Sequence, residues 1–224
     1  MSDKDVRDFA AFLKKQTKLF KNVHVTLLTN EKATRSAVIR ELNYRLRRAD
    51  KDDTVIIFLS GHGADDPNAP GEFFFLTHDA DPEYLAADAV NMSRQWFVER
   101  LDCKRLVLIA DACHAGGFSS KVTKALRRSR ENLMKIFQES EGKVFTTSSR
   151  PDELSIEKPE YGNGLFTYYL LQGLGGEADK DREGVVALKE LYDYVYKQTK
   201  ADSDGYQSPQ MEGRVVGAFP MSLV

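Results

Sequence analysis

Residues 105–117 read RLVLIADACHAGG, a run of aliphatic residues that breaks off into an acid, a cysteine, a histidine and two glycines. A second stretch of the same kind, TVIIFLSGHG, occupies residues 54–63. Neither run alternates apolar with polar residues, which is typical of strands covered on both faces in a parallel sheet. The sequence therefore predicts two central strands that each end in a glycine-containing segment.

Along the rest of the chain, apolar residues at helical spacing alternate with short aliphatic or β-branched runs. The predicted strands span residues 23–28, 54–60, 72–77, 105–110, 143–148 and 214–219. The predicted helices span residues 3–20, 34–49, 93–101, 121–139, 164–174 and 187–200. This alternation is typical of βαβ units, so we predict one α/β domain over residues 1–224 with a largely parallel sheet.

The composition excludes several classes of function. With 224 residues, 42% of them hydrophobic, the chain suffices for one domain with a sizeable core. A formal net charge of -2 gives no global reason to expect a nucleic acid or an anionic membrane as partner. No apolar run reaches the length of a membrane span or a secretory signal. The two cysteines form no disulfide framework, so we expect reduced thiols in the cytoplasm.

The predicted chemistry lies where the two central strands end. In open α/β folds, the carboxyl ends of parallel strands meet at the edge that holds the reactive groups. If the strands at 54–60 and 105–110 are neighbours, this edge brings together His62 and Cys113, about fifty residues apart in the sequence. A cysteine attacks as its thiolate, and a nearby imidazole can accept its proton. We therefore predict a Cys/His dyad, with the backbone N–H groups of Gly63 and Cys113 as oxyanion donors.

Each half of this pair has a structural alternative when it is taken alone. A cysteine at a strand end is often a small buried hydrophobe, and a histidine between glycines can simply hydrogen-bond the backbone. We interpret Cys103, which precedes a strand, as structural. The other histidines are poorly placed to act as the base: His24 lies within a predicted strand, His78 precedes an acidic loop, and His114 diverges from the nucleophile.

The paired motif resembles the caspase-like cysteine peptidases, which include caspases, metacaspases and their bacterial relatives. The resemblance rests on FLSGHG (58–63) and LIADACHAGG (108–117) and extends through LLTNEKATRSAVIREL (27–42), FLTHDAD (75–81), TTSSRPDELSIE (146–157), GNGLFTYYLLQGL (162–174) and LKELYDYV (188–195). It implies a caspase-hemoglobinase-like three-layer α/β/α sandwich. It also implies an endopeptidase acting on proteins or peptides, with Cys113 as nucleophile and His62 as general base.

In this family, the residue two before the nucleophile lines the pocket for the side chain N-terminal to the cut bond. Here that residue is Asp111, whose carboxylate favours a cation, so the resemblance implies cleavage after Arg or Lys. The alternative is that Asp111 caps the turn after its strand. Asn30 stands where metacaspases often have a second acid. Ser148, at the end of the strand predicted at 143–148, completes the expected substrate-binding set.

Two features depart from the family pattern. The chain lacks the apolar strand with which the family's sheet begins, so we expect a fragment of a longer chain, or a strand supplied by another polypeptide. Asp79, Asp81 and Asp88 are too scattered to reproduce the family's calcium cluster. DKDREGVVALKE (179–190) matches an EF-hand loop but also fits a simple turn. We therefore expect no metal and no cofactor, with calcium as the alternative.

The segment 118–142 joins the nucleophile's loop to the next strand and contains five basic residues, Lys121, Lys124, Arg127, Arg128 and Arg130. In the resembling family, proteolysis separates a large and a small subunit in this region. We hypothesise that the segment lies over or near the expected substrate-binding groove as a pseudo-substrate, and that cleavage by this enzyme or by an upstream protease activates the protein. The alternative is a solvated helix with an ordinary basic face.

Two functions from other classes stay open. One is a catalytically silent caspase-like scaffold that binds a partner through the same groove. The other is a nucleotide-binding domain. The chain keeps both His62 and Cys113, and no predicted strand is followed by a Walker or Rossmann glycine pattern, so both alternatives are disfavoured.

Overall fold

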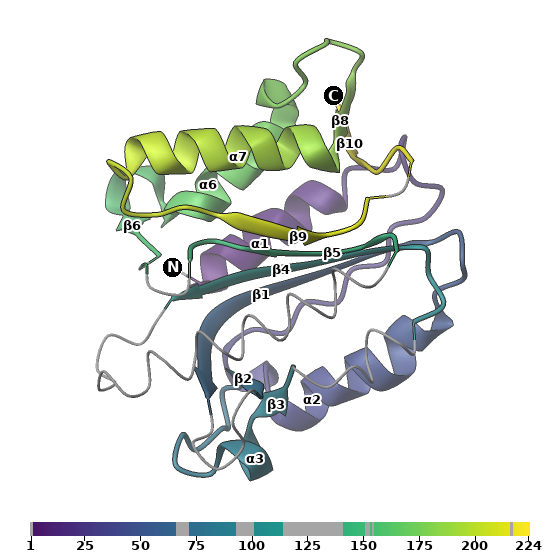
Figure 1. Ribbon diagram of the computed structural model, residues 1–224. Coiled ribbons are helices and arrows are strands. Elements are labelled where there is room, and N and C mark those ends of the chain that lie inside the picture. Colours follow the sequence, from purple (N-terminus) through teal and green to yellow (C-terminus); the bar gives the residue numbers. More distant parts are fainter. Residues whose placement is uncertain are drawn as a thin grey trace.

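The computed structural model of the protein describes residues 2–65, 72–92, 101–113, 141–150, 153, 155–215 and 217–224. Within these residues, the largest sheet has six strands in the order β3-β2-β1-β4-β5-β9 (Figure 1). The strands are β1 (Thr54–Asp65), β2 (Phe73–Leu76), β3 (Val90–Asn91), β4 (Arg105–Cys113), β5 (Lys143–Thr147) and β9 (Gln210–Gly213). Strands β1, β4 and β5 pair in parallel, and the outer strands join them in antiparallel pairs.

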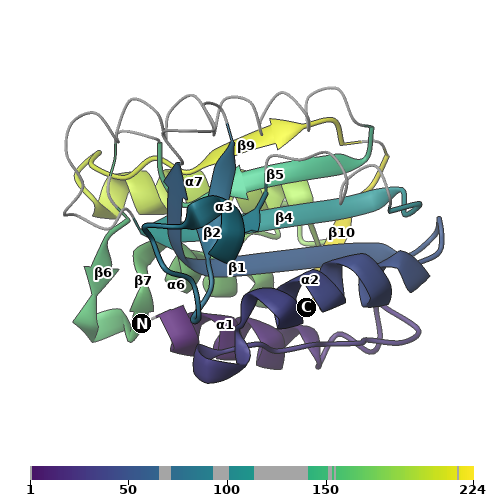
Figure 2. The same cartoon turned by 90° about the horizontal axis from the view of Figure 1, so that it is seen from below.

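Helices cover both faces of this sheet. On one face lie α1 (Ser2–Leu13), α6 (Leu165–Gln172) and α7 (Leu188–Asp202), and on the other lies α2 (Arg35–Arg40) with its continuations η2 (Glu41–Arg45) and η3 (Leu46–Arg48) (Figures 1 and 2). The shorter elements are η1 (Asn30–Lys32), α3 (Leu85–Asp88), β6 (Glu157–Lys158), η4 (Pro159–Tyr161), β7 (Asn163–Gly164), η5 (Gly173–Glu177), β8 (Val185–Ala187) and β10 (Pro220–Leu223). The three layers confirm the predicted α/β/α sandwich.

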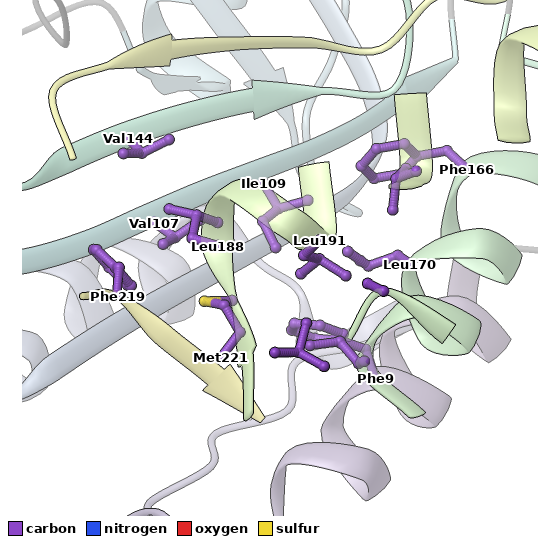
Figure 3. Packing of buried hydrophobic residues seen from close by; sticks show 14 residues of the cluster. Phe9, Val107, Ile109, Val144, Phe166, Leu170, Leu188, Leu191, Phe219 and Met221 are labelled. Carbon is purple, nitrogen blue, oxygen red and sulfur yellow. The ribbon is translucent and has the colours of Figure 1, made fainter. Parts of the chain in front are cut away.

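The apolar run in β4 explains why both faces are covered. Leu106 and Leu108 pack into the core on the α2 side, whereas Val107 and Ile109 pack into the core formed with α1, α6 and α7 (Figure 3). All four side chains are at most 1% exposed. Burying one aliphatic side chain contributes about 1.5–3 kcal/mol to the stability of the fold, so the four buried side chains of β4 stabilise it strongly.

Four predicted strands are present, as β1, β2, β4 and β5. Strands β1 and β4 are longer than predicted, because β4 stays in register with β1 as far as Cys113, and residues 62–65 of β1 pair with β2. His62 and Cys113 therefore lie within strands and not in the turns that follow them. Tertiary pairing, which the local pattern does not contain, sets these strand ends.

The predicted strands at 23–28 and 214–219 are wrong. In the described structure, residues 23–28 pair with no strand, and the edge of β1 that faces away from β4 has a partner only from His62 onward. Strand β9 ends at Gly213, whose φ is 128°. Beyond it, within the described residues, only Arg214 forms an isolated bridge, with Glu141, before β10 pairs with β8. A short run of β-branched and aliphatic residues favours a strand, but it does not supply a neighbouring strand for its backbone.

The predicted helices agree better with the structure. The helix expected at 34–49 is present as α2, η2 and η3 in succession, and those at 164–174 and 187–200 are present as α6 with η5 and as α7. The first helix ends at Leu13, earlier than predicted. Residues 93–100 and 121–139 of the other two lie outside the described residues. Among the described helices, none is long and apolar enough to cross a membrane.

Candidate active site

His62 and Cys113 are register partners in neighbouring parallel strands. The ladder between β1 and β4 runs from the pair Thr54–Arg105 to the pair His62–Cys113. Adjacent strands lie about 4.7–4.9 Å apart, so the two backbones meet side by side at the end of the ladder. The His62 side chain is exposed to solvent. The side chain of Cys113 lies outside the described part of the chain.

Gly63 has a packing reason to be glycine. In β1 it pairs with Phe75 of β2, and a Cβ atom at this position would lie 2.3 Å from the ring of Phe73. The absence of a side chain therefore lets the aromatic strand β2 lie against the end of β1. This close approach is also what extends β1 past His62.

Asp111 is a buried acid on β4, with 4% of its surface exposed. The Thr167 hydroxyl of α6 donates to its Oδ2 at 2.7 Å, and the Ser155 hydroxyl donates to its Oδ1 at 2.9 Å. Burial raises the pKa of Asp111, and these two hydrogen bonds oppose that rise. Ser148 is fully buried, and its hydroxyl also lowers this pKa, although its geometry falls short of a hydrogen bond.

A second buried acid, Asp5 in the first turn of α1, lies beside Asp111 and was not among the predicted residues. The carboxylates flank Gly164 of β7: a Cβ atom there would lie 3.3 Å from Asp111 Oδ2 and 3.4 Å from Asp5 Oδ2. Asn163 Nδ2 donates to Asp5 Oδ1 at 2.8 Å, and the Gly164 N–H donates to the same oxygen at 3.2 Å. Burial raises the pKa of Asp5, and the negative charge of Asp111 adds to this rise.

Among the described residues, no cation lies within ion-pair distance of these two carboxylates. Neither Asp5 nor Asp111 takes part in an ion pair there, and the nearby Lys4 pairs instead with Asp8 at 2.5 Å. The exposed Glu157 of β6 adds a third negative charge, which raises the pKa of Asp111 further. Uncompensated buried carboxylates are costly to a fold, so this arrangement favours a cationic ligand.

Asn30 lies elsewhere. It is exposed in η1, with a φ of 49°, and within the described structure no hydrogen bond joins it to Asp111. The second acid is instead Asp5. The sequence contained one indication of this role. Asp5 lies four residues before Phe9, so both share the buried face of α1, and a carboxylate on an apolar helix face needs an explanation.

The loop before α7 and the first turn of α7 hold the one group of three metal-ligand side chains found within the described residues. The ligand atoms of Asp179, Asp181 and Glu190 lie within 4.8 Å of one another. Asp179 accepts the N–H groups of Glu183 and Gly184, and Glu190 accepts the Ala187 N–H at the start of α7. The bonds to Asp179 fit the simple turn that the sequence left open beside calcium, and the bond to Glu190 caps the start of α7.

The predicted processing residues, Lys121, Lys124, Arg127, Arg128 and Arg130, lie outside the described residues, as does His114. Cys103 is 2% exposed in the core beneath α2, and burial raises the pKa of its thiol. A buried thiol of this kind is a poor nucleophile.

Comparison with known proteins gives a family. A family model of the caspase domain, peptidase C14, matches residues 1–219. The chain is also similar to the crystal structure of protein GSU0716 from Geobacter sulfurreducens, with a TM-score of 0.65, 18% sequence identity, and coverage of 99% of this chain and 89% of that chain. This likeness concerns the fold alone. No curated protein matches. Since the family match covers nearly the whole sequence, the chain belongs to the caspase domain family, peptidase C14.

Proposed function

We propose that the protein is a cysteine endopeptidase that cleaves proteins after Arg or Lys with a Cys113/His62 dyad. Membership of the caspase domain family supports a cysteine peptidase acting on protein substrates. The observation that carries the dyad is the register pairing of His62 with Cys113 at the end of the β1–β4 ladder. A reducing compartment such as the cytoplasm suits this chemistry, since the nucleophile must be a free thiol.

The reaction proceeds through an acyl-enzyme. The Cys113 thiolate attacks the scissile carbonyl carbon, and the N–H groups of Gly63 and Cys113 donate to the resulting oxyanion. When the C–N bond breaks, the His62 imidazolium gives its proton to the leaving amine, and a thioester is left on the sulfur. Water then attacks the thioester with His62 as base, which releases the new carboxylate and regenerates the thiol.

Specificity for a basic residue follows from the two buried acids. Asp5 and Asp111 lack a cation among the described residues, and a guanidinium or ammonium group from the substrate supplies one. Hydrogen bonds between ionised partners are roughly twice as strong as neutral ones. The hydroxyl groups of Thr167 and Ser155 keep the Asp111 carboxylate in place.

The dyad is tested by measuring turnover of peptides that differ only in the residue before the cut, Arg, Lys, Leu or Asp. We expect cleavage of the Arg and Lys peptides, and no measurable turnover in Cys113→Ala or His62→Ala. Cys103→Ala is the matched control, since it removes the other cysteine, and it should keep the activity. Near-wild-type turnover in either dyad variant would contradict the assignment.

The silent scaffold is separated from the enzyme by a thiol-reactive probe on a basic peptide. An enzyme with the proposed pocket is labelled, and the label is lost in Cys113→Ala and weakened in Asp111→Ala. A scaffold that binds the peptide without an activated thiol holds it reversibly and takes no label.

A further inference from the structure

A fully buried amide links the loop after α7 to the segment that holds Asp111. Gln207 is 0% exposed. Its Nε2 donates to the Ser148 carbonyl at 2.9 Å and to Ser155 Oγ at 3.4 Å, and its Oε1 accepts the Ile156 N–H at 2.8 Å. One side chain thus bridges both ends of the segment that follows β5.

The partners determine which way this amide points. The Ile156 N–H can only donate and the Ser148 carbonyl can only accept, so exchanging the oxygen and nitrogen of the amide would break both bonds. The backbone of Gln207 is also held, because its N–H donates to Ser203 Oγ at 3.0 Å. The Nε2 group of Gln207 is therefore fixed as a donor toward Ser155.

The Nε2 donor of Gln207 determines the direction in which the Ser155 hydroxyl donates its own hydrogen bond. A hydroxyl has one proton to give, and Ser155 Oγ receives a hydrogen bond from Gln207. Its own proton is then directed to Asp111 Oδ1, at 2.9 Å. The chain of donation runs from the amide to the hydroxyl and then to the carboxylate of the pocket.

We propose that Gln207 is a positioning residue for the substrate pocket, which orients Ser155 so that its hydroxyl donates to Asp111 and holds that carboxylate ready for a basic side chain. The role rests on the proposed function, in which Asp111 is a pocket acid. Gln207 contacts neither the substrate nor the reacting atoms, and it acts through Ser155.

The surroundings of Asp111 make this donor important. Asp5 of α1 and Glu157 of β6 bring negative charge to it, and burial acts in the same direction by favouring its neutral form. Thr167 of α6 and Ser155 oppose these effects by donating to it. Losing the Ser155 donor therefore favours protonation of Asp111, which weakens binding of a cation.

The test uses Gln207→Met, which keeps the side-chain length and removes the donor without adding charge. We expect the KM for an Arg peptide to rise about tenfold with kcat almost unchanged, and the acid limb of kcat/KM to move up by about one pH unit. In a Ser155→Ala background the same substitution should have no further effect on either quantity, since both act through one hydrogen bond. Gln172→Met, the same change at an exposed position of α6, is the control.

Ser203→Ala is the milder variant, and it decides the matter if Gln207→Met fails to fold. It removes the hydrogen bonds of Ser203 Oγ with the Gln207 N–H and with the carbonyls of Gln207 and Lys200, and it leaves the Gln207 amide in the chain. We expect a change in KM and in the acid limb in the same direction and of smaller size. If Ser203→Ala instead lowers kcat and leaves KM unchanged, the variant has a general structural defect, and the positioning role is overturned.

A titration that needs no substrate separates this inference from the proposed function. The carboxyl carbon of Asp111 is followed by NMR in the full chain and assigned with Asp111→Asn, and its pKa should rise in Gln207→Met. If the wild type cleaves no basic peptide but this rise is seen, the proposed function fails, whereas the action of Gln207 on Asp111 through Ser155 stands. If the wild type cleaves basic peptides and Gln207→Met changes neither KM nor the pKa of Asp111, the positioning role is wrong.

Discussion

Asp5→Asn removes one of the two buried charges of the proposed pocket and changes little else. Both hydrogen bonds that the Asp5 carboxylate accepts, from Asn163 and from Gly164, go to Oδ1. An asparagine oxygen can take both of them, and its Nδ2 then replaces the oxygen that flanks Gly164. The substitution therefore tests the charge of Asp5 rather than its shape.

The expected loss of activity follows from the strength of a charge-assisted contact. A hydrogen bond to a charged group contributes about 1.5–3 kcal/mol, so kcat/KM for Arg and Lys peptides should fall roughly 10- to 150-fold. Most of this loss should appear in KM, because in the proposed function Asp5 binds the side chain before the cut and does not touch the reacting bond. Peptides with Leu at that position should change less than twofold.

The expected change in stability has the opposite sign. Burial raises the pKa of Asp5 in the folded state. A carboxyl group with a raised folded pKa stabilises the fold below its unfolded pKa and loses that contribution as the pH rises through the folded value. At pH 7 the ionised Asp5 is therefore unfavourable for folding, and Asp5→Asn should melt higher, by about 2–4 °C for each kcal/mol gained. The gain should disappear as the pH falls toward the ordinary aspartate range.

Two assays check this prediction: steady-state kinetics with the Arg, Lys and Leu peptides, and thermal unfolding at a series of pH values. Asp8→Asn is the matched control, since Asp8 lies on the same helix but is partly exposed and paired with Lys4. Its activity should stay near wild type. An Asp5→Asn variant that keeps the full preference for Arg would refute the two-acid pocket. If Asp5→Asn melts at a lower temperature than the wild type at pH 7, the inference that the ionised Asp5 destabilises the fold is wrong.

Gly63→Ala should lower the free energy of unfolding by about 1–3 kcal/mol, because its Cβ would overlap the Phe73 ring. Thermal unfolding should show this loss. Gly175→Ala is the control and should lose far less, since no atom lies within 4 Å of the Cβ position there. Calcium should not be obligatory, because Asp179 and Glu190 already accept backbone N–H groups in a turn and in the cap of α7. Turnover that stops on chelation and returns with calcium would contradict this. Incubation of wild type and Cys113→Ala at high concentration, with fragments mapped by mass spectrometry, should show cleavage within 118–142 in the wild type alone. Intact chains in both samples would exclude self-processing.

The central part of the fold could be predicted because its signal is local. The runs in β1 and β4 lack polar residues on either face, and only strands covered on both sides have this pattern. Their ends could not be predicted, because residues 62–65 join β1 only through β2. The β-branched and aliphatic run at residues 23–28 predicted a strand, but a strand also needs a neighbour for its backbone, and the described structure provides none there.

The candidate site was predictable only in part. Asp111 could be found because its distance from Cys113 is a local feature of the motif. Asp5 lies more than a hundred residues away in the sequence, and acids are common in the first turn of a helix for electrostatic reasons alone. Only the packing of α1 on the sheet brings Asp5 to Asp111. The role of Gln207 could not be predicted for the same reason, since its partners Ser148 and Ser155 belong to a different segment.

The origin of the pocket residues limits what cleavage within 118–142 could do. Asp5 and Asp111 would belong to the N-terminal piece, whereas Ser155, Thr167 and Gln207 would belong to the C-terminal piece. The acids and the groups that hold them would then come from two chains. The parallel ladder between β4 and β5, from Leu106–Lys143 to Ala110–Thr147, would join these pieces through the centre of the sheet. Cleavage could therefore free the groove but could not separate the pieces without destroying the pocket, so an active processed enzyme must contain both.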